Sequence, residues 1–420
     1  MAPHAESVTL NSHTSAHTKK SPANVVVEEK GPTGSMNDPP TDFRSSNSSP
    51  LKLTGILNQF KSFDVTPVIG KEFPEANLAE WLRAPNSDQL LKDLAITISQ
   101  RGVVFFRAQD GLDNGLQKEL LGRLGELSGK PKSSKMYIEP TANDGTDASG
   151  DLEINTISSR RLKKIFPRGA KVQSGKGSWH SDATFEKVTY PFPISPGKRS
   201  KVLTEAWAHV KMPPDYSSLR LVEIPSTGGD TIWASGYELY DRISEPYQKF
   251  LEGLTVTFAQ PKFNEVAKMG GFKLYSDPRG SPLNVGELLQ AVHPVVRTNP
   301  VTGWKSVFAV GVHVQHINDV TPLESKALQE WFMNLIVENQ DLQVRFRWQN
   351  ANDLAIWDNR STYHTATSDY YDDPAERMGR RAISVGEKPF FDVGSKSRRE
   401  ALWELATAAN GHGEKGAPAS

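Results

Sequence analysis

The sequence contains no cysteine in its 420 residues. Disulfides, thiolate metal sites and cysteine nucleophiles are therefore excluded, and any metal or acid–base chemistry has to use histidine, aspartate or glutamate. The sequence also lacks an excess of either charge, because 49 lysines and arginines balance 49 aspartates and glutamates. Without a net charge to steer the chain toward nucleic acid or an anionic membrane, we expect its partner to be a small molecule or another protein.

Long apolar runs are missing as well. No stretch approaches the roughly 20 apolar residues of a membrane-spanning helix, and the N-terminus lacks the apolar segment of a secretory signal. We therefore expect a cytoplasmic protein that binds neither membrane nor nucleic acid. Residues 1–50 and 408–420 are polar and poor in aromatic side chains, which is typical of disordered tails. Residues 51–407 are then expected to form a single domain.

Between these tails the hydrophobic periodicity is mixed, with patterns of both helices and strands. Helical spacing of apolar residues predicts helices over 86–100, 112–127, 235–254 and 321–338. Alternating or continuous apolar residues predict strands over 103–106, 153–158, 292–297, 304–314, 343–348, 353–357 and 381–385. Many short strands late in the chain, with helices before and between them, indicate an antiparallel β core with helical decoration.

Two histidines and one aspartate stand out as candidate metal ligands. His180 and Asp182 are two residues apart in the segment WHSDATFE, and on a strand such residues point to the same face. Taken alone, this pair is more often a surface hydrogen bond. His364, however, follows an apolar strand, and two histidines with one carboxylate form the facial triad of non-heme Fe(II) oxygenases. Arg377 adds a guanidinium that matches a carboxylate.

Further segments complete a resemblance to a known family. They are PSTGGDTIWASGYELYDRIS at 225–244, VHPVVRTNPVTGWKSVF at 292–308 and RMGRRAISVGEKPF at 377–390. Together with the segments around His180 and His364, they resemble the Fe(II)/2-oxoglutarate-dependent dioxygenases of the taurine dioxygenase (TauD/TfdA) type, especially fungal members. The resemblance spans roughly residues 65–392.

The resemblance implies a fold, a reaction and a set of site residues. The fold is a mainly β double-stranded β-helix, a cupin-like jelly roll. The enzyme uses Fe(II), 2-oxoglutarate and O2, releases succinate and CO2, and hydroxylates a small organic substrate that is sulfonate- or taurine-like or related to these. It needs no catalytic side chain beyond the iron centre, and its relatives include homo-oligomers. The implied roles are His180, Asp182 and His364 as metal ligands, Thr231 and Arg377 as 2-oxoglutarate ligands, and Arg381 as a contact for an anionic substrate.

One departure from the family concerns the substrate pocket. Relatives that take sulfonates often carry a Leu-His-x-His-Pro segment, whereas this chain has Met-Tyr-Ile-Glu-Pro at 136–140. Glu139 would place a negative charge where an anion sits, and like charges in a dry pocket repel. We hypothesise that Glu139 and Tyr137 select an amine-bearing or uncharged substrate, which argues against taurine. The alternative is that residues 136–140 form a surface loop.

A second departure is an atypical insertion of 24 residues at 188–211, whose composition fits neither neighbour. The codons of its first and last residues can contain the donor and acceptor signals of an intron, and those of Leu203 and Thr204 can contain the branch signal. We therefore hypothesise that the segment is a retained, in-frame intron. If the segment is real, it forms a long loop beside the metal site, and His209 then lines the pocket. The sequence leaves other functions open, namely a non-catalytic metal-binding jelly-roll protein, a member inactivated by the insertion, or a zinc hydrolase. His293 is interpreted as a hydrogen-bonded core residue or a residue that supports a metal ligand, and His313 and His316 as structural or partly exposed.

Overall fold

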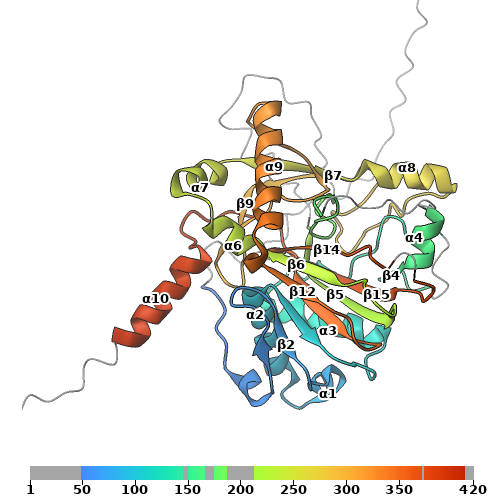
Figure 1. Cartoon of the computed structure of the whole chain (residues 1–420), viewed down its shortest axis with the longest axis horizontal. Helices are drawn as coiled ribbons and strands as arrows, with labels where there is room; N and C mark the ends of the chain where they lie inside the picture. The colour runs from blue at the N-terminus through green and yellow to red at the C-terminus, as the bar shows by residue number, and fades with distance from the viewer. Residues whose placement is uncertain (1–48, 145–149, 166–174, 187–211, 371–372, 412–420) are drawn as a thin grey trace, which may run out of the picture. The chain divides into compact units, whose positions relative to one another are not determined.

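The computed structural model of the chain describes residues 49–144, 150–165, 175–186, 212–370 and 373–411 (Figure 1). The tails expected before residue 49 and after residue 411 lie outside the described residues, as does the atypical segment 188–211. Helix α10 (Arg398–Gly411) continues four residues beyond the expected domain end at 407. In the part of the chain that the structure describes, no helix is both long and apolar enough to cross a membrane.

The largest sheet has seven strands and provides one wall of the fold. Its strands pair in the order β1 (Phe63–Asp64), β2 (Lys71–Phe73), β3 (Val103–Phe106), β13 (Leu354–Asp358), β5 (Pro214–Glu223), β15 (Met378–Val385) and β4 (Ile154–Ser158). The β2–β3 pair is parallel and the other pairs are antiparallel. Strands from the beginning and end of the described chain thus meet in one sheet.

Three smaller sheets complete the β structure. A three-stranded sheet has the order β12 (Gln343–Phe346), β6 (Thr231–Ser235) and β14 (Thr362–Ala366). A second has the order β11 (Val314–Ile317), β7 (Thr255–Ala259) and β8 (Gln290–Pro294), and a hairpin joins β9 (Val296–Thr298) to β10 (Lys305–Val307). These pairs are all antiparallel.

Alternation along the central strands explains how the layers pack. Val104 of β3 faces the helices α1 (Leu78–Arg83), α2 (Ser87–Arg101) and α3 (Asn114–Ser128) and joins their apolar cluster. Its neighbour Phe105 points to the other face, where its ring stacks on Phe346 of β12 with 4.2 Å between ring centroids. The large sheet and the β12-β6-β14 sheet therefore face each other across an apolar layer.

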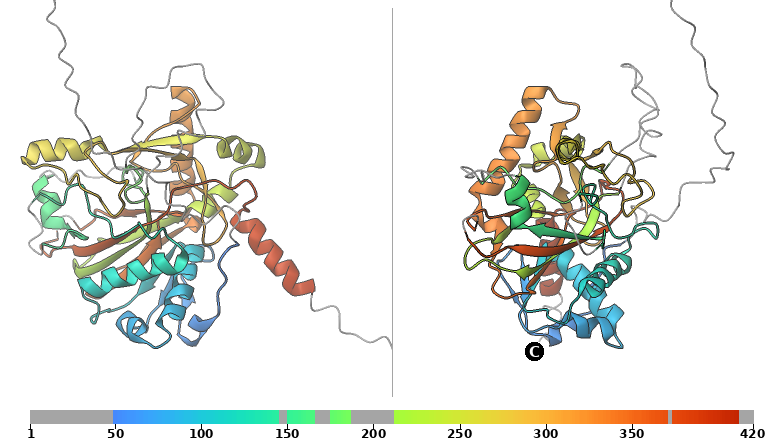
Figure 2. Two further views of the ribbon diagram at one scale, coloured as in Figure 1. Left: turned by 180° about the vertical axis from the view of Figure 1, so that it is seen from behind. Right: turned by 90° about the vertical axis from the view of Figure 1, so that its right-hand side faces the viewer.

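The remaining helices lie mostly away from α1–α3. In Figures 1 and 2, α1–α3 (blue to cyan) lie on one side of the stacked sheets and α7–α9 (yellow-green to orange) on the other. The bounds are η1 (Ile56–Gln59), α4 (Ser159–Ile165), α6 (Gly236–Asp241), α7 (Glu245–Glu252), α8 (Pro261–Gly270), α9 (Pro322–Glu338) and η3 (Gln340–Leu342). The described chain is thus a mixture of sheets and helices.

Three predicted elements differ from the structure. The strand expected over 292–297 is divided into β8 and β9, which belong to different sheets. The helix expected over 235–254 is divided into α6 and α7, because a new helix begins after Ser244 with a proline in its first turn. The strand expected over 304–314 ends with β10, and the chain then turns through Gly311, whose φ is +101°. This turn brings the 309–313 segment against the candidate site.

Candidate metal centre

A short backbone pairing brings the two candidate histidines together. His180 and His364 form an antiparallel bridge in which each N–H donates to the carbonyl of the other, at 3.1 and 2.8 Å. Directly paired residues project their side chains from the same face, and the two imidazole rings lie 4.3 Å apart between centroids. His364 lies in the middle of β14, so the pairing attaches the segment that carries His180 to the smaller sheet.

Asp182 reaches the same place by a turn, which corrects the prediction that His180 and Asp182 share a strand. The residues after His180 form a turn in which Ala183 has a φ of 44°. Asn359 holds this turn, because its side-chain oxygen accepts from the Asp182 backbone N–H at 3.2 Å. The Asn359 amide also donates to Ser217 Oγ at 2.7 Å, and Ser217 Oγ donates to Asp182 Oδ2 at 2.8 Å.

The three side chains form the kind of group that holds a metal ion. One ligand atom each from His180, Asp182 and His364 lies within 4.8 Å of the others, and His364 Nε2 is 3.9 Å from Asp182 Oδ1. His180 Nδ1 lies 2.8 Å from the carbonyl of Ser178. Because a carbonyl only accepts, Nδ1 carries the proton and Nε2 keeps its lone pair for a metal.

The electrostatics of the three groups fit a divalent cation. Burial lowers the pKa of His180, and burial together with His180 lowers the pKa of His364 to about 3. Burial alone would raise the pKa of Asp182, but the positive charge of Arg381 and the two imidazoles lower it to about 2. At neutral pH the site therefore presents two neutral imidazoles and one carboxylate, the forms that bind metal, and this donor set suits Fe(II).

Arg377 and Thr231 lie together where the strands β15 and β6 begin. The Arg377 side chain is buried, and its Nε donates to the carbonyl of Gly229 at 2.7 Å while Nη2 donates to Thr231 Oγ1 at 3.3 Å. Thr231 and His364 are on the paired strands β6 and β14, on the same face. Among the described residues no carboxylate forms an ion pair with Arg377. A buried guanidinium without a counter-ion is costly, so this site fits an external carboxylate.

Arg381 contacts the candidate metal centre directly. Its Nη1 donates to Asp182 Oδ1 at 2.6 Å and its Nη2 to Glu139 Oε2 at 3.1 Å. Side chains alternate along β15, as the sequence predicts. Arg381 therefore points toward Asp182, whereas Arg380 points away and donates to Thr156 on β4. The position of Arg381 between two carboxylates was not predicted.

The segment around Glu139 is attached to the large sheet, so it is not a surface loop. Met136 pairs with Ser384, and the Tyr137 N–H donates to the carbonyl of Ile383 at 2.8 Å. The Tyr137 hydroxyl is buried and donates to Glu186 Oε1 at 2.8 Å. In this structure Tyr137 therefore supports the wall of the site, while Glu139 pairs with Arg381.

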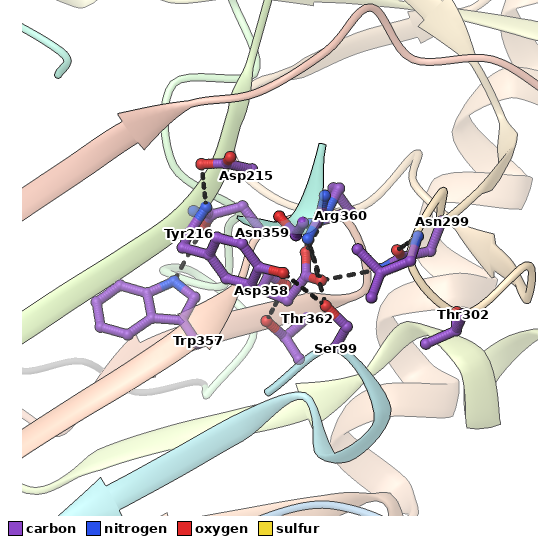
Figure 3. A network of polar contacts seen from close by, with 12 residues as sticks. Ser99, Asp215, Tyr216, Asn299, Thr302, Trp357, Asp358, Asn359, Arg360 and Thr362 are labelled. Atoms are coloured by element: carbon purple, nitrogen blue, oxygen red, sulfur yellow. Dashed lines mark hydrogen bonds and ion pairs between the residues drawn. The ribbon is translucent and has the colours of Figure 1, made fainter. Parts of the chain in front are cut away.

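A buried polar network supports the strand that carries His364 (Figure 3). Asp358 accepts hydrogen bonds from Arg360 and from the amide of Asn299, and Arg360 also donates to Ser99. The Arg360 backbone N–H also donates to Asp358 Oδ1 at 2.9 Å, so Asp358 caps the turn that leads into β14. Both carboxylate oxygens of Asp358 therefore accept hydrogen bonds from within the protein.

The position of His313 beside His180 was missed from the sequence. The ring of His313 is 5.6 Å from that of His180 and 4.8 Å from that of Phe185, and it is buried. Gly311, whose φ is +101°, turns the chain at this point, and the Val312 N–H donates to the Trp179 carbonyl at 3.0 Å. No pattern in the sequence distinguishes His313 from a core histidine.

We expect Gly311→Ala to disrupt this part of the site. A Cβ at position 311 would lie 2.3 Å from the carbonyl oxygen of Trp179 and 2.9 Å from Cα of His180, at a φ of +101°. Clash and backbone strain together should cost about 2–4 kcal/mol of unfolding free energy, measured by urea denaturation. Gly122→Ala, in helix α3, is the control, because a Cβ added at position 122 would have no neighbouring atom within 4 Å. Equal stability of Gly311→Ala and the parent would contradict this packing.

Comparison with known proteins places the chain in a family. Residues 202–383 match the model of the "Taurine catabolism dioxygenase TauD, TfdA family". The chain is 50% identical to the alpha-ketoglutarate-dependent dioxygenase btcD of Neocamarosporium betae, over 84% of this chain and 98% of that protein. It is 28% identical to an alpha-ketoglutarate-dependent sulfonate dioxygenase of Saccharomyces cerevisiae, over 80% of this chain and 69% of that protein.

Solved structures agree on the fold. The crystal structure of a taurine dioxygenase from Burkholderia xenovorans superposes with a TM-score of 0.54 at 24% identity, over 80% of this chain and 93% of that one. The chain therefore belongs to the TauD/TfdA family of alpha-ketoglutarate-dependent dioxygenases, where alpha-ketoglutarate is 2-oxoglutarate.

Proposed function

We propose that this dioxygenase binds Fe(II) through His180, Asp182 and His364, binds 2-oxoglutarate through Arg377 and Thr231, and hydroxylates a small organic substrate with release of succinate and CO2. The convergence of the three ligand atoms within 4.8 Å carries the proposal. The facing sheets would then be the two halves of a jelly roll, with the metal between them. A cytoplasmic location and a homo-oligomeric state stay predictions.

Each residue has a physical task in this proposal. A bound ferrous ion supplies the redox chemistry of O2 and 2-oxoglutarate. Ser217 orients the Asp182 carboxylate, and Asn359 holds both Ser217 and the Asp182 backbone N–H. The backbone bridge fixes the two imidazoles. Arg377 neutralises and orients the distant carboxylate of 2-oxoglutarate. The apolar layer between the sheets limits access of water.

Succinate formation tests the proposed function. The full chain is incubated with Fe(II), ascorbate and 2-oxoglutarate against a panel of sulfonates, amino acids and purines, and succinate is measured. We expect succinate that depends on Fe(II), on 2-oxoglutarate and on one class of added compound. A metal-binding jelly roll without turnover would produce none, and a zinc hydrolase would act without 2-oxoglutarate.

We also propose that residues 188–211 are not needed for the fold. The described residues that flank this segment, Glu186 and Met212, are both bound by one turn, at 279–284. Arg279 donates twice to the Glu186 carboxylate at 2.8 Å, and the Asn284 amide donates to the Met212 carbonyl at 2.9 Å. Neither attachment uses a residue of 188–211, so both can form when these residues are removed.

A variant that lacks residues 188–211 is therefore expected to fold and to keep its metal site. Circular dichroism melting and metal content after dialysis check this expectation, with the full chain as reference. If the deletion variant aggregates or melts much earlier, the segment is part of the fold. Sequencing the transcript separately tests the intron hypothesis, because a cDNA that contains these codons excludes it.

A further inference from the structure

We propose that Trp348 is a positioning residue of the cosubstrate site, because its indole N–H and Arg377 together leave the proton of the Thr231 hydroxyl free for an incoming carboxylate. This inference rests on the proposed function, since it concerns how the same site recognises the distant carboxylate of 2-oxoglutarate. It assigns a role to a residue that the sequence did not single out.

Trp348 donates to the same oxygen as Arg377. Its Nε1 lies 3.2 Å from Thr231 Oγ1, and Arg377 Nη2 lies 3.3 Å from that oxygen. A threonine hydroxyl has one proton to donate and two lone pairs that accept. Because an indole N–H and a guanidinium N–H can only donate, these two contacts use both lone pairs. The hydroxyl proton of Thr231 is then left for a third partner.

No described residue accepts that proton. Thr231 is buried, and within the described chain its side chain makes only the two hydrogen bonds that it accepts. Thr231 also lies on the face of its sheet that carries His364. A buried donor needs an acceptor, and a carboxylate that pairs with the Arg377 guanidinium can accept from the neighbouring hydroxyl as well. An external carboxylate therefore satisfies both groups.

An aromatic stack holds the indole in place. The ring of Trp348 meets the ring of Phe346 edge to face, with 4.9 Å between centroids, and Phe346 stacks on Phe105 at 4.2 Å. Trp348 is also buried. The direction of its N–H is therefore fixed, and so is the orientation of the hydroxyl that accepts from it. A donor that is oriented before the ligand arrives loses less freedom on binding, which favours affinity.

Trp348→Phe removes the N–H and keeps an aromatic ring. Its effect is measured by calorimetric titration of 2-oxoglutarate into the full chain loaded with Mn(II). We expect the Kd to rise about three- to tenfold, which corresponds to one neutral hydrogen bond. Thr231→Val should raise the Kd at least about tenfold, because the lost hydroxyl donates to a charged group. If Trp348→Phe does not fold by circular dichroism, Trp348→Leu, which also lacks the N–H, replaces it.

The double variant distinguishes positioning from packing. If Trp348 acts through the hydroxyl, Trp348→Phe should change the Kd less than about twofold in a chain that already carries Thr231→Val. A side chain that only fills space would have the same effect in both backgrounds. Thr231→Ser keeps a hydroxyl, so Trp348→Phe should regain its full effect in that background.

Trp81→Phe is the matched control. It is the same substitution at a buried tryptophan that packs on Phe73 and Phe106 in the apolar cluster of α1–α3. It should leave the Kd for 2-oxoglutarate as in the parent.

Three results would overturn the inference. They are a Kd of Trp348→Phe equal to that of the parent, an undiminished effect of Trp348→Phe in the Thr231→Val chain, and an equal rise of the Kd in Trp81→Phe. Failure of the proposed function looks different, because the parent itself would then bind no 2-oxoglutarate and form no succinate.

Discussion

Arg377→Ala is expected to abolish activity by removing 2-oxoglutarate binding. Removing one partner of a buried charge pair costs about 2–5 kcal/mol, which corresponds to a loss of roughly 30-fold to several thousand-fold in affinity for 2-oxoglutarate. The reason lies in the structure, where the buried Arg377 guanidinium donates to Gly229 and Thr231 and pairs with no described carboxylate. Calorimetric titration of 2-oxoglutarate and succinate formation measure the effect.

The neighbouring arginine on the same strand provides the control. Arg380 bonds to Thr156 on β4, so Arg380→Ala should keep the parent's 2-oxoglutarate affinity. The comparison separates loss of a specific charge from general damage to β15. Unchanged 2-oxoglutarate binding in Arg377→Ala would exclude the proposed cosubstrate site.

His364→Ala is expected to lose the metal while the fold persists. The variant removes one of three ligands and the imidazole that lies 3.9 Å from Asp182. We expect metal affinity to fall by at least roughly 100-fold, because the remaining imidazole and carboxylate no longer form a facial triad. Metal content after dialysis measures this directly. Added metal should also raise the melting temperature of the parent and not of the variant.

His316→Ala is the matched control for this experiment. His316 is exposed on β11, away from the two paired histidines. Its variant should bind metal like the parent. Equal metal content in the His364 variant and the parent would show that the metal binds elsewhere.

Local signals explain why several elements were predicted correctly. Helix α2 ends where Gly102 adopts a φ of 75°, and helix α9 begins at Thr321 with a capping box that includes Glu324. The strand β3 is a continuous apolar run that is buried on both faces. These features depend on a few neighbouring residues, so periodicity and capping residues suffice to predict them.

The residues of the candidate site were predicted by type, but their geometry was not. The strand argument for His180 and Asp182 was wrong, because Ala183 turns the chain and Asn359 holds the turn from far along the sequence. The Arg381–Glu139 pair likewise joins residues of distant segments. Contacts of this kind depend on how the sheets pack, and no local pattern encodes them.

The most direct test of the account is a crystal of the full chain grown with Mn(II), with anomalous diffraction collected to locate the ion. The account predicts an anomalous peak between the imidazoles of His180 and His364 and the carboxylate of Asp182. A peak bound by other side chains, with these three left without metal, would contradict it.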